Sequence, residues 1–174
     1  RARGTPFTGI LYAGLMLTEA GPKLIEYNTR FGDPEAQVLL PRLASDLVPA
    51  LLSACDGDLS GVAIAFEEGR AALTVVMAAA GYPGTVVRGS AIEGIDRAEA
   101  VEDVFVYQAG TREEDGRLLS DGGRVLAVTA LGATVTEAQG RAYAAVARID
   151  WPDGFCRRDI GARAIAREAQ GGAI

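Results

Sequence analysis

The sequence has 174 residues, 49% of them hydrophobic, which is typical of a folded globular protein and excludes a disordered chain. Its formal net charge of −6 argues against non-specific binding to a nucleic-acid backbone, which needs clustered positive charge. The chain contains no histidine, and this excludes histidine-based catalytic triads and histidine metal sites. No apolar run is long enough to span a bilayer. From the charge we expect no nucleic-acid partner, and from the lack of such a run we expect no membrane partner.

Two further features concern location and completeness. The only cysteines, Cys55 and Cys156, are too few for a disulfide framework, which fits a reducing, cytoplasmic location. The sequence opens on Arg1 without an initiator methionine and enters an apolar strand almost at once. We therefore expect a fragment that begins within a longer protein.

The first elements predict a hairpin. Apolar runs at 9–17 and 24–29 have the length of strands, and the turn-like stretch between them contains Gly21 and Pro22. Residues 9–29 are therefore predicted to form two antiparallel strands.

Helices are predicted after the hairpin. Asp33 has the position of an N-cap and Pro34 that of the first helical residue. Pro41 is expected to kink or end this helix. A second helix is expected to begin near Ser45-Asp46 and to have Gly57 as its C-cap.

The composition becomes polar and glycine-rich at 56–61, followed by a short predicted strand at 62–66 and a charged break. We expect a domain boundary in this break, which divides the chain into domains 1–68 and 69–174.

The second predicted domain contains strands and one clear helix. Pro83 and Gly84 suit a type II turn, and Gly110 to Gly123 is expected to be a polar loop. Thr134 and Glu137 form a capping box, which predicts a helix with one apolar stripe. The predicted strands are 72–80, 101–108 and 125–131, and the stripe consists of Val135, Ala138, Ala142, Val146 and Ile149. These patterns predict an α+β fold.

The residues best suited to bind a metal ion or a phosphate lie on the second predicted strand. Glu26, Asn28 and Arg30 alternate with Ile25 and Tyr27, so the polar side chains share one face while the apolar ones point to a core. Carboxylate and amide oxygens suit Mg²⁺ or Mn²⁺, and a guanidinium suits phosphate. The alternative is the solvated face of a half-exposed sheet.

The neighbouring residues also have two interpretations each. Arg30 is either a phosphate ligand or a partner in a surface salt bridge with Glu26 or Asp33. Asp33 is either an N-cap or part of an anion site at a helix N-terminus. Glu35 either complements the helix dipole or binds a substrate amine.

Together these stretches resemble the phosphoribosylamine–glycine ligase family, also called glycinamide ribonucleotide synthetases, of the ATP-grasp superfamily. The resemblance covers almost the whole chain, as a C-terminal portion of such an enzyme. It is strongest at 9–16 and 25–37, above all in Arg30-Phe31-Gly32-Asp33-Pro34-Glu35, and continues at 81–84, 109–111, 122–125 and 157–161.

The resemblance implies a fold and a reaction. The fold is the C-terminal half of an ATP-grasp domain, an antiparallel sheet plus helices, followed by a small mixed C-terminal α+β domain. The reaction is ATP-dependent ligation of glycine to 5-phosphoribosylamine through a glycyl phosphate, giving glycinamide ribonucleotide, ADP and phosphate in purine biosynthesis. ATP is then a substrate, and Mg²⁺ or Mn²⁺ the cofactor.

The resemblance also implies roles for individual residues. Glu26 and Asn28 match the divalent-metal ligands of the family, and Arg30 matches a catalytic arginine that faces the phosphates. The substrate-binding loop comprises Gly32, Asp33, Pro34 and Glu35.

Two departures from the family pattern stand out. Many ATP-grasp enzymes have a further metal-binding carboxylate at the position of Gly14, and this family often has a histidine at the position of Gln108. The nucleotide-binding half of the family is not among these residues, so we expect the chain alone to be inactive and to need the missing N-terminal half. The rival interpretations are a noncatalytic scaffold or regulatory fragment, and another ATP-grasp purine ligase.

Overall fold

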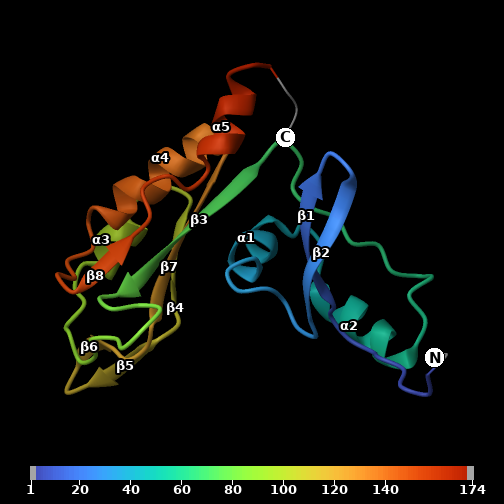
Figure 1. Cartoon of the computed structure of the whole chain (residues 1–174), viewed down its shortest axis with the longest axis horizontal. Coiled ribbons are helices and arrows are strands. Elements are labelled where there is room, and N and C mark those ends of the chain that lie inside the picture. Colours follow the sequence, from blue (N-terminus) through green and yellow to red (C-terminus); the bar gives the residue numbers. More distant parts are fainter. Residues whose placement is uncertain (1–2, 172–174) are drawn as a thin grey trace. The chain divides into compact units, whose positions relative to one another are not determined.

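A computed structural model describes residues 3–171, and the chain divides into two compact units (Figure 1). Unit 1 consists of Arg1–Ala36 and Leu43–Glu67, and unit 2 of Gln37–Arg42 and Glu68–Ile174. Both contain antiparallel strands and helices, which confirms the predicted α+β class. The assignment of domains 1–68 and 69–174 stays a prediction.

Unit 1 contains the predicted hairpin. Strands β1 (Tyr12–Thr18) and β2 (Gly21–Asn28) pair antiparallel, which confirms the prediction. The turn is tighter than expected, because only Glu19 and Ala20 lie between the strands. Gly21 already pairs with Thr18, so the Gly-Pro sequence begins β2 instead of forming the turn.

The second helix of unit 1 is also as predicted. Helix α2 (Leu47–Asp56) has Asp46 as its N-cap, and the Asp46 carboxylate accepts from the backbone N–H of Val48 at 2.9 Å. Gly57 ends the helix in the left-handed region at φ 79°, which glycine adopts without steric cost.

The predicted start of the first helix is wrong. The Asp33–Pro34 peptide bond is cis and lies in a turn, so Asp33 is not an N-cap and Pro34 is not the first helical residue. Helix α1 (Ala36–Leu39) begins after this turn, where the Ala36 N–H donates to the carbonyl of Gly32. It changes at once into the 3-10 helix η1 (Leu40–Arg42), which contains Pro41.

The short strand predicted at 62–66 is also wrong. In this segment Phe66 forms an isolated bridge to Leu43, and the Ala65 N–H donates to the hydroxyl of Ser45. Within residues 3–171 the segment has no partner strand, so its β-forming residues build no ladder.

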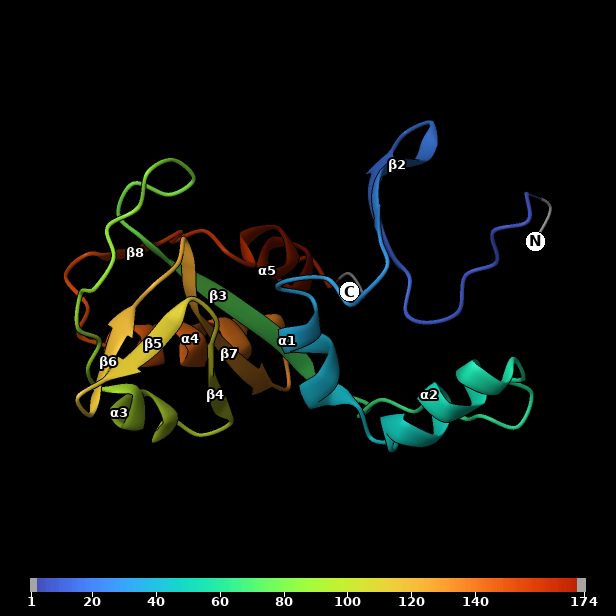
Figure 2. The ribbon, with the colours of Figure 1, turned by 90° about the horizontal axis from the view of Figure 1, so that it is seen from below.

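Unit 2 is built on a four-stranded antiparallel sheet in the order β4-β7-β3-β8. Its strands are β3 (Ala71–Ala79), β4 (Val104–Gln108), β7 (Arg124–Gly132) and β8 (Gly154–Cys156). Helix α4 (Val135–Val146) lies along the sheet and packs against its two central strands, β3 and β7 (Figure 2). The first three of these strands and the helix were predicted, with shifted ends.

Small buried side chains bring α4 close to the sheet. Ala138 and Ala142 have no exposed surface, and the whole predicted stripe is buried. The hydroxyl of Thr134 accepts from the Glu137 N–H at 3.1 Å, which confirms Thr134 as the N-cap. The Glu137 carboxylate instead accepts from the N–H of Ala133, one residue before the N-cap.

The predicted polar loop contains a second hairpin, formed by β5 (Thr111–Glu114) and β6 (Arg117–Ser120). Asp115 and Gly116 connect the strands with φ values of 51° and 70°. Asp-Gly at two positive φ values is typical of a type I′ hairpin turn, and this dipeptide is the sequence signal for the missed hairpin.

The turn at Pro83 also differs from the prediction. The Gly84 N–H donates to the Gly81 carbonyl at 2.8 Å, so Pro83 is the third residue of the turn, not the second. The Tyr82–Pro83 bond is cis, which places this turn in type VI rather than type II.

Two shorter helices complete unit 2, α3 (Ile95–Glu99) and α5 (Ala162–Glu168). The Glu168 carboxylate of α5 accepts from the backbone N–H groups of Val135 and Thr136 at 2.6 and 3.0 Å, and from the Thr136 hydroxyl at 2.7 Å. It thus satisfies free donors at the N-terminus of α4. None of the helices within residues 3–171 is long and apolar enough to cross a membrane.

This contact predicts a pH-dependent stability of unit 2. Hydrogen bonds from the Thr136 hydroxyl and from the backbone at Val135 and Thr136 lower the pKa of Glu168 below its ordinary value near 4.5. The ionised carboxylate therefore stabilises the fold above pH 4.5, and this stabilisation is lost as the pH falls through the lowered pKa. We expect Glu168→Gln to unfold at lower urea concentration than the parent at neutral pH, with a difference that shrinks in acid.

The measurement can use Trp151, which is the only tryptophan of the chain and is 4% exposed in the core of unit 2. Glu113→Gln is the matched control, because Glu113 is exposed on β5. A difference between Glu168→Gln and the parent that stays constant from neutral pH to about pH 3 would contradict the assignment.

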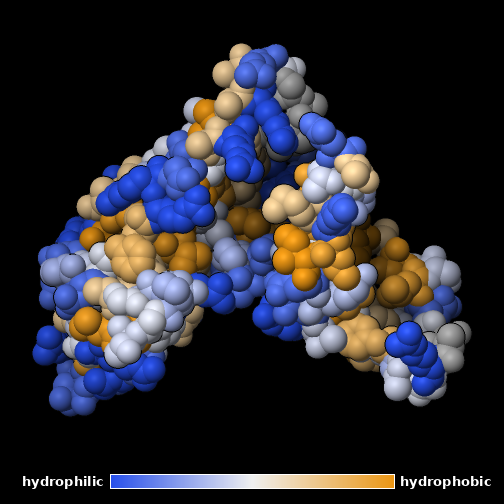
Figure 3. Space-filling model, viewed as in Figure 1, coloured by the Kyte–Doolittle hydropathy of each residue, from blue (hydrophilic) through white to orange (hydrophobic). Residues whose placement is uncertain are grey.

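Unit 1 buries much less apolar surface than unit 2. Within the described residues its one buried hydrophobic residue is Ala50, and apolar side chains gather at the surface over β1 and β2 (Figure 3). Ile25 and Tyr27, which were expected to face a core, are 64% and 61% exposed, so this prediction is wrong. Leu15, Met16, Leu17 and Leu24 are exposed as well.

This contrast predicts different local stabilities. Amide hydrogens on β1 and β2 are expected to exchange with solvent faster than those on β3 and β7, because few buried contacts oppose opening of the hairpin. Hydrogen exchange of the chain at neutral pH, resolved by residue, measures this directly. Equal protection in the two pairs of strands would refute it.

Candidate metal and substrate site

Glu26 and Asn28 lie side by side near the end of β2. The Asn28 side-chain nitrogen donates to Glu26 Oε1 at 3.0 Å, which shows that the two side chains share one face of the hairpin. Glu26 is exposed and Asn28 half-buried, so solvent reaches the pair. The Asn28 carbonyl oxygen and the Glu26 carboxylate are hard oxygen donors of the kind that Mg²⁺ and Mn²⁺ prefer.

Gly14 lies directly opposite Glu26 in the register of the hairpin. A Cβ atom added to Gly14 would be 3.2 Å from Glu26 Cγ and 3.5 Å from Cε1 of Tyr12. The position that holds a further carboxylate in many ATP-grasp enzymes therefore lies next to both Glu26 and Tyr12. A side chain at this position would require a small shift of the Glu26 side chain.

The donor set suits a partly hydrated divalent ion. Within residues 3–171 no three His, Cys, Asp or Glu side chains converge as a metal site. Mg²⁺ commonly takes one or two protein oxygens and completes its coordination with water and substrate phosphates. Glu26 and Asn28 match this open pattern and would make a poor cage alone.

Arg30 lies beyond the end of β2 and is exposed. Its Nη1 donates to the carbonyl of Phe31 at 2.7 Å, so the guanidinium turns toward the backbone of the following loop. The regular alternation of the strand therefore does not extend to Arg30.

The loop from Gly32 to Glu35 folds compactly. The Glu35 side chain bends back over Gly32, where an added Cβ would lie 2.1 Å from Glu35 Oε2. Gly32 is buried and Asp33 exposed, with Pro34 and Glu35 between these extremes. A larger residue at position 32 would displace the Glu35 carboxylate.

Tyr12 is a member of this site that the sequence did not indicate. Its hydroxyl donates to Glu35 Oε1 at 3.0 Å. This hydrogen bond, with burial and the negative charges of Glu35 and Glu26, raises the pKa of Tyr12 above its ordinary value of 10.0. The available signal was alternation, since Tyr12 lies two residues before Gly14 and therefore on the same face of β1.

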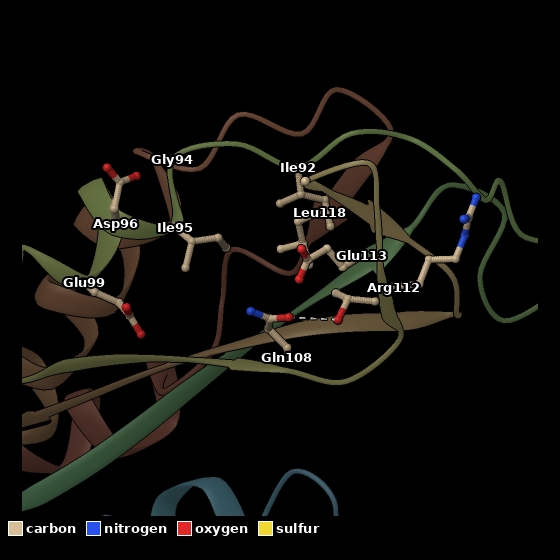
Figure 4. Close-up of a pocket in the computed structure, with 11 residues that line it drawn as sticks. Ile92, Gly94, Ile95, Asp96, Glu99, Gln108, Arg112, Glu113 and Leu118 are labelled. Atoms are coloured by element: carbon tan, nitrogen blue, oxygen red, sulfur yellow. Dashed lines mark hydrogen bonds between the residues drawn. The ribbon is translucent and has the colours of Figure 1, made fainter.

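The structure thus brings Tyr12, Glu26, Asn28 and Glu35 together in unit 1. A separate open pocket of about 700 Å³ lies in unit 2, next to α3, β5 and β6 (Figure 4). Gln108 lines it and accepts a hydrogen bond from the Thr111 hydroxyl at 3.1 Å. None of the predicted site residues lines this pocket.

Comparison with known proteins identifies the family. Residues 72–163 match the family model "Phosphoribosylglycinamide synthetase, C domain", and residues 1–36 match "Phosphoribosylglycinamide synthetase, ATP-grasp (A) domain". The residues of the site described above, from Tyr12 to Glu35, all lie within the second of these matches.

Individual relatives agree with the family models. A phosphoribosylamine–glycine ligase of Mesorhizobium japonicum is 63% identical over 165 residues, which are 95% of this chain and 38% of that protein. The corresponding ligase of Allochromatium vinosum is 56% identical over 168 residues, 96% of this chain and 39% of that protein. The chain thus spans less than two fifths of the length of these relatives.

A solved structure also matches. The crystal structure of phosphoribosylamine–glycine ligase from Thermotoga maritima has a TM-score of 0.72 and 34% sequence identity, covering 86% of this chain and 36% of that one. The predicted fold, the second part of an ATP-grasp domain followed by a small C-terminal domain, agrees with these matches. The chain belongs to the phosphoribosylglycinamide synthetase family, also known as the phosphoribosylamine–glycine ligases, and corresponds to a C-terminal portion of its members.

Proposed function

We propose that this chain is part of an ATP-dependent ligase that joins glycine to 5-phosphoribosylamine through a glycyl phosphate. The products are glycinamide ribonucleotide, ADP and phosphate. The observation that supports this proposal best is the Glu26–Asn28 pair. It lies on the same face of the β1–β2 hairpin as Tyr12, whose hydroxyl binds Glu35 of the following loop. Family membership supplies the reaction class.

Each site residue has a role under this proposal. Glu26 and Asn28 hold Mg²⁺ or Mn²⁺ through oxygen atoms, and the bound ion would neutralise and orient the ATP phosphates. Arg30 stabilises the negative charge of the transferring phosphoryl group or acyl phosphate. Its exposed position leaves it room to turn from the Phe31 carbonyl to such an anion.

Under this proposal 5-phosphoribosylamine, the substrate that receives the glycyl group, binds beside a loop that consists of Gly32, Asp33, Pro34 and Glu35. Gly32 lets the Glu35 carboxylate fold close to the backbone, and carboxylate oxygens accept hydrogen bonds from amines and hydroxyls.

The proposal extends to the organisation of the protein. We assign residues 1–68 to the ATP-grasp domain and 69–174 to the C-terminal domain. The part of the relatives that precedes this segment would supply the remaining contacts to ATP and substrates. A cytoplasmic location fits a biosynthetic enzyme with two unpaired cysteines.

The role of Glu26 is tested in a full-length protein that contains this segment. Glu26→Ala is expected to lower kcat/KM more than about 100-fold, since loss of a direct metal ligand costs at least as much as loss of its supporting contacts. Glu19→Ala is the matched control, because Glu19 is exposed in the hairpin turn. Normal turnover by Glu26→Ala would show that the metal assignment is wrong.

The same assay applied to the 174-residue chain alone should detect no product, because the chain spans only 38% of its relatives. Glycinamide ribonucleotide formed by the isolated chain would contradict this expectation. A noncatalytic fragment remains the rival interpretation, and inactivity of the full-length protein would favour it.

A further inference from the structure

Tyr12 occupies a central place in the candidate site. In the register of the hairpin it lies opposite Asn28, while Gly14 lies opposite Glu26. Residues two apart on a strand share a face, so all four belong to the same face of the hairpin. The space above Gly14 confirms this, because a Cβ there would contact both Tyr12 and Glu26.

The Tyr12 hydroxyl links this face to the loop that follows. It donates to Glu35 Oε1 at 3.0 Å, a contact between residues 23 positions apart. The other oxygen of Glu35 lies close over Gly32. The carboxylate is thus held by a hydrogen bond from β1 and lies against the backbone at Gly32.

The Glu35 carboxylate can accept a hydrogen bond from the substrate while it is bound to Tyr12. The Tyr12 hydroxyl donates to one of the two carboxylate oxygens of Glu35. An ionised carboxylate has more acceptor positions than one phenol can fill. Glu35 can therefore bind Tyr12 and a donor of the substrate together.

Gly14 lies beside both side chains on this face. A Cβ atom at position 14 would lie 3.2 Å from Glu26 Cγ, which is a tight contact, and 3.5 Å from Cε1 of Tyr12, which is an ordinary van der Waals contact.

From these contacts we propose that Tyr12 is a positioning residue, whose hydroxyl holds Glu35 in place to bind the amine-bearing sugar phosphate. This inference rests on the ligase function proposed above and deepens it. Tyr12 itself contacts Glu35 and acts on the substrate through that carboxylate.

The test uses steady-state kinetics of the full-length protein with Tyr12→Phe. Tyr12→Phe removes the hydrogen bond to the Glu35 carboxylate, so we expect the KM for the amine substrate to rise about 10-fold or more. The KM for ATP and kcat should stay within about twofold. A merely structural role would change all three parameters or lower the melting temperature.

Tyr27→Phe is the matched control, because Tyr27 lies on β2 next to Glu26 but on the opposite face and is 61% exposed. It should leave every kinetic parameter unchanged. A change as large as that of Tyr12→Phe would overturn the proposal.

A double-mutant cycle tests whether Tyr12 acts on the KM for the amine substrate through Glu35. Glu35→Ala should raise the same KM, and adding Tyr12→Phe to it should have no further effect, since the two residues act as one unit. Additive effects, or an unchanged KM in Tyr12→Phe, would overturn the role of Tyr12 while leaving the ligase function intact. A parent protein without ligase activity would instead overturn the proposed function, and this inference with it.

Discussion

The register of the β1–β2 hairpin is the constraint on which the candidate site depends. It places Gly14 opposite Glu26 and Tyr12 opposite Asn28, so that four side-chain positions share one face. A shift of β2 by one residue would move Glu26 and Asn28 to the face opposite Tyr12 and Gly14. The irregularity between Gly14 and Leu15 lies directly beside this group, where the pairing partner changes from Glu26 to Leu24. The two proposed metal ligands are therefore aligned with Tyr12 by the backbone pairing of the hairpin.

The two units achieve their structure in different ways. Unit 2 packs a helix with small residues, Ala138 and Ala142, onto a sheet whose central strand β7 is almost fully buried. Close packing of this kind stabilises a domain by itself. Unit 1 leaves most of its apolar side chains at the surface and places its polar site on a hairpin with few buried neighbours. Its site is thus held by local contacts such as Tyr12–Glu35 and Asn28–Glu26.

Much of the fold could be predicted because its signals are local. The hairpin, the caps at Asp46, Gly57 and Thr134, and the buried stripe of α4 follow from residue types at fixed spacings. The failures have different causes. Asp33 and Pro34 have the sequence of a helix start, but they lie in a turn and α1 begins only at Ala36. Within residues 3–171 the segment 62–66 forms one isolated bridge, from Phe66 to Leu43, and has no partner strand.

The sequence by itself determined the candidate metal ligands and the family resemblance, because Glu26, Asn28 and the loop after them are contiguous and alternate with period two. Only the tertiary structure decided that the Tyr12 hydroxyl binds Glu35 and that Gly14 lies opposite Glu26. Both facts depend on which residues face each other across two strands and on how a loop folds back 23 positions later. Alternation along one strand shows which residues share a face, but the contacts between segments depend on the register and on the path of the loop.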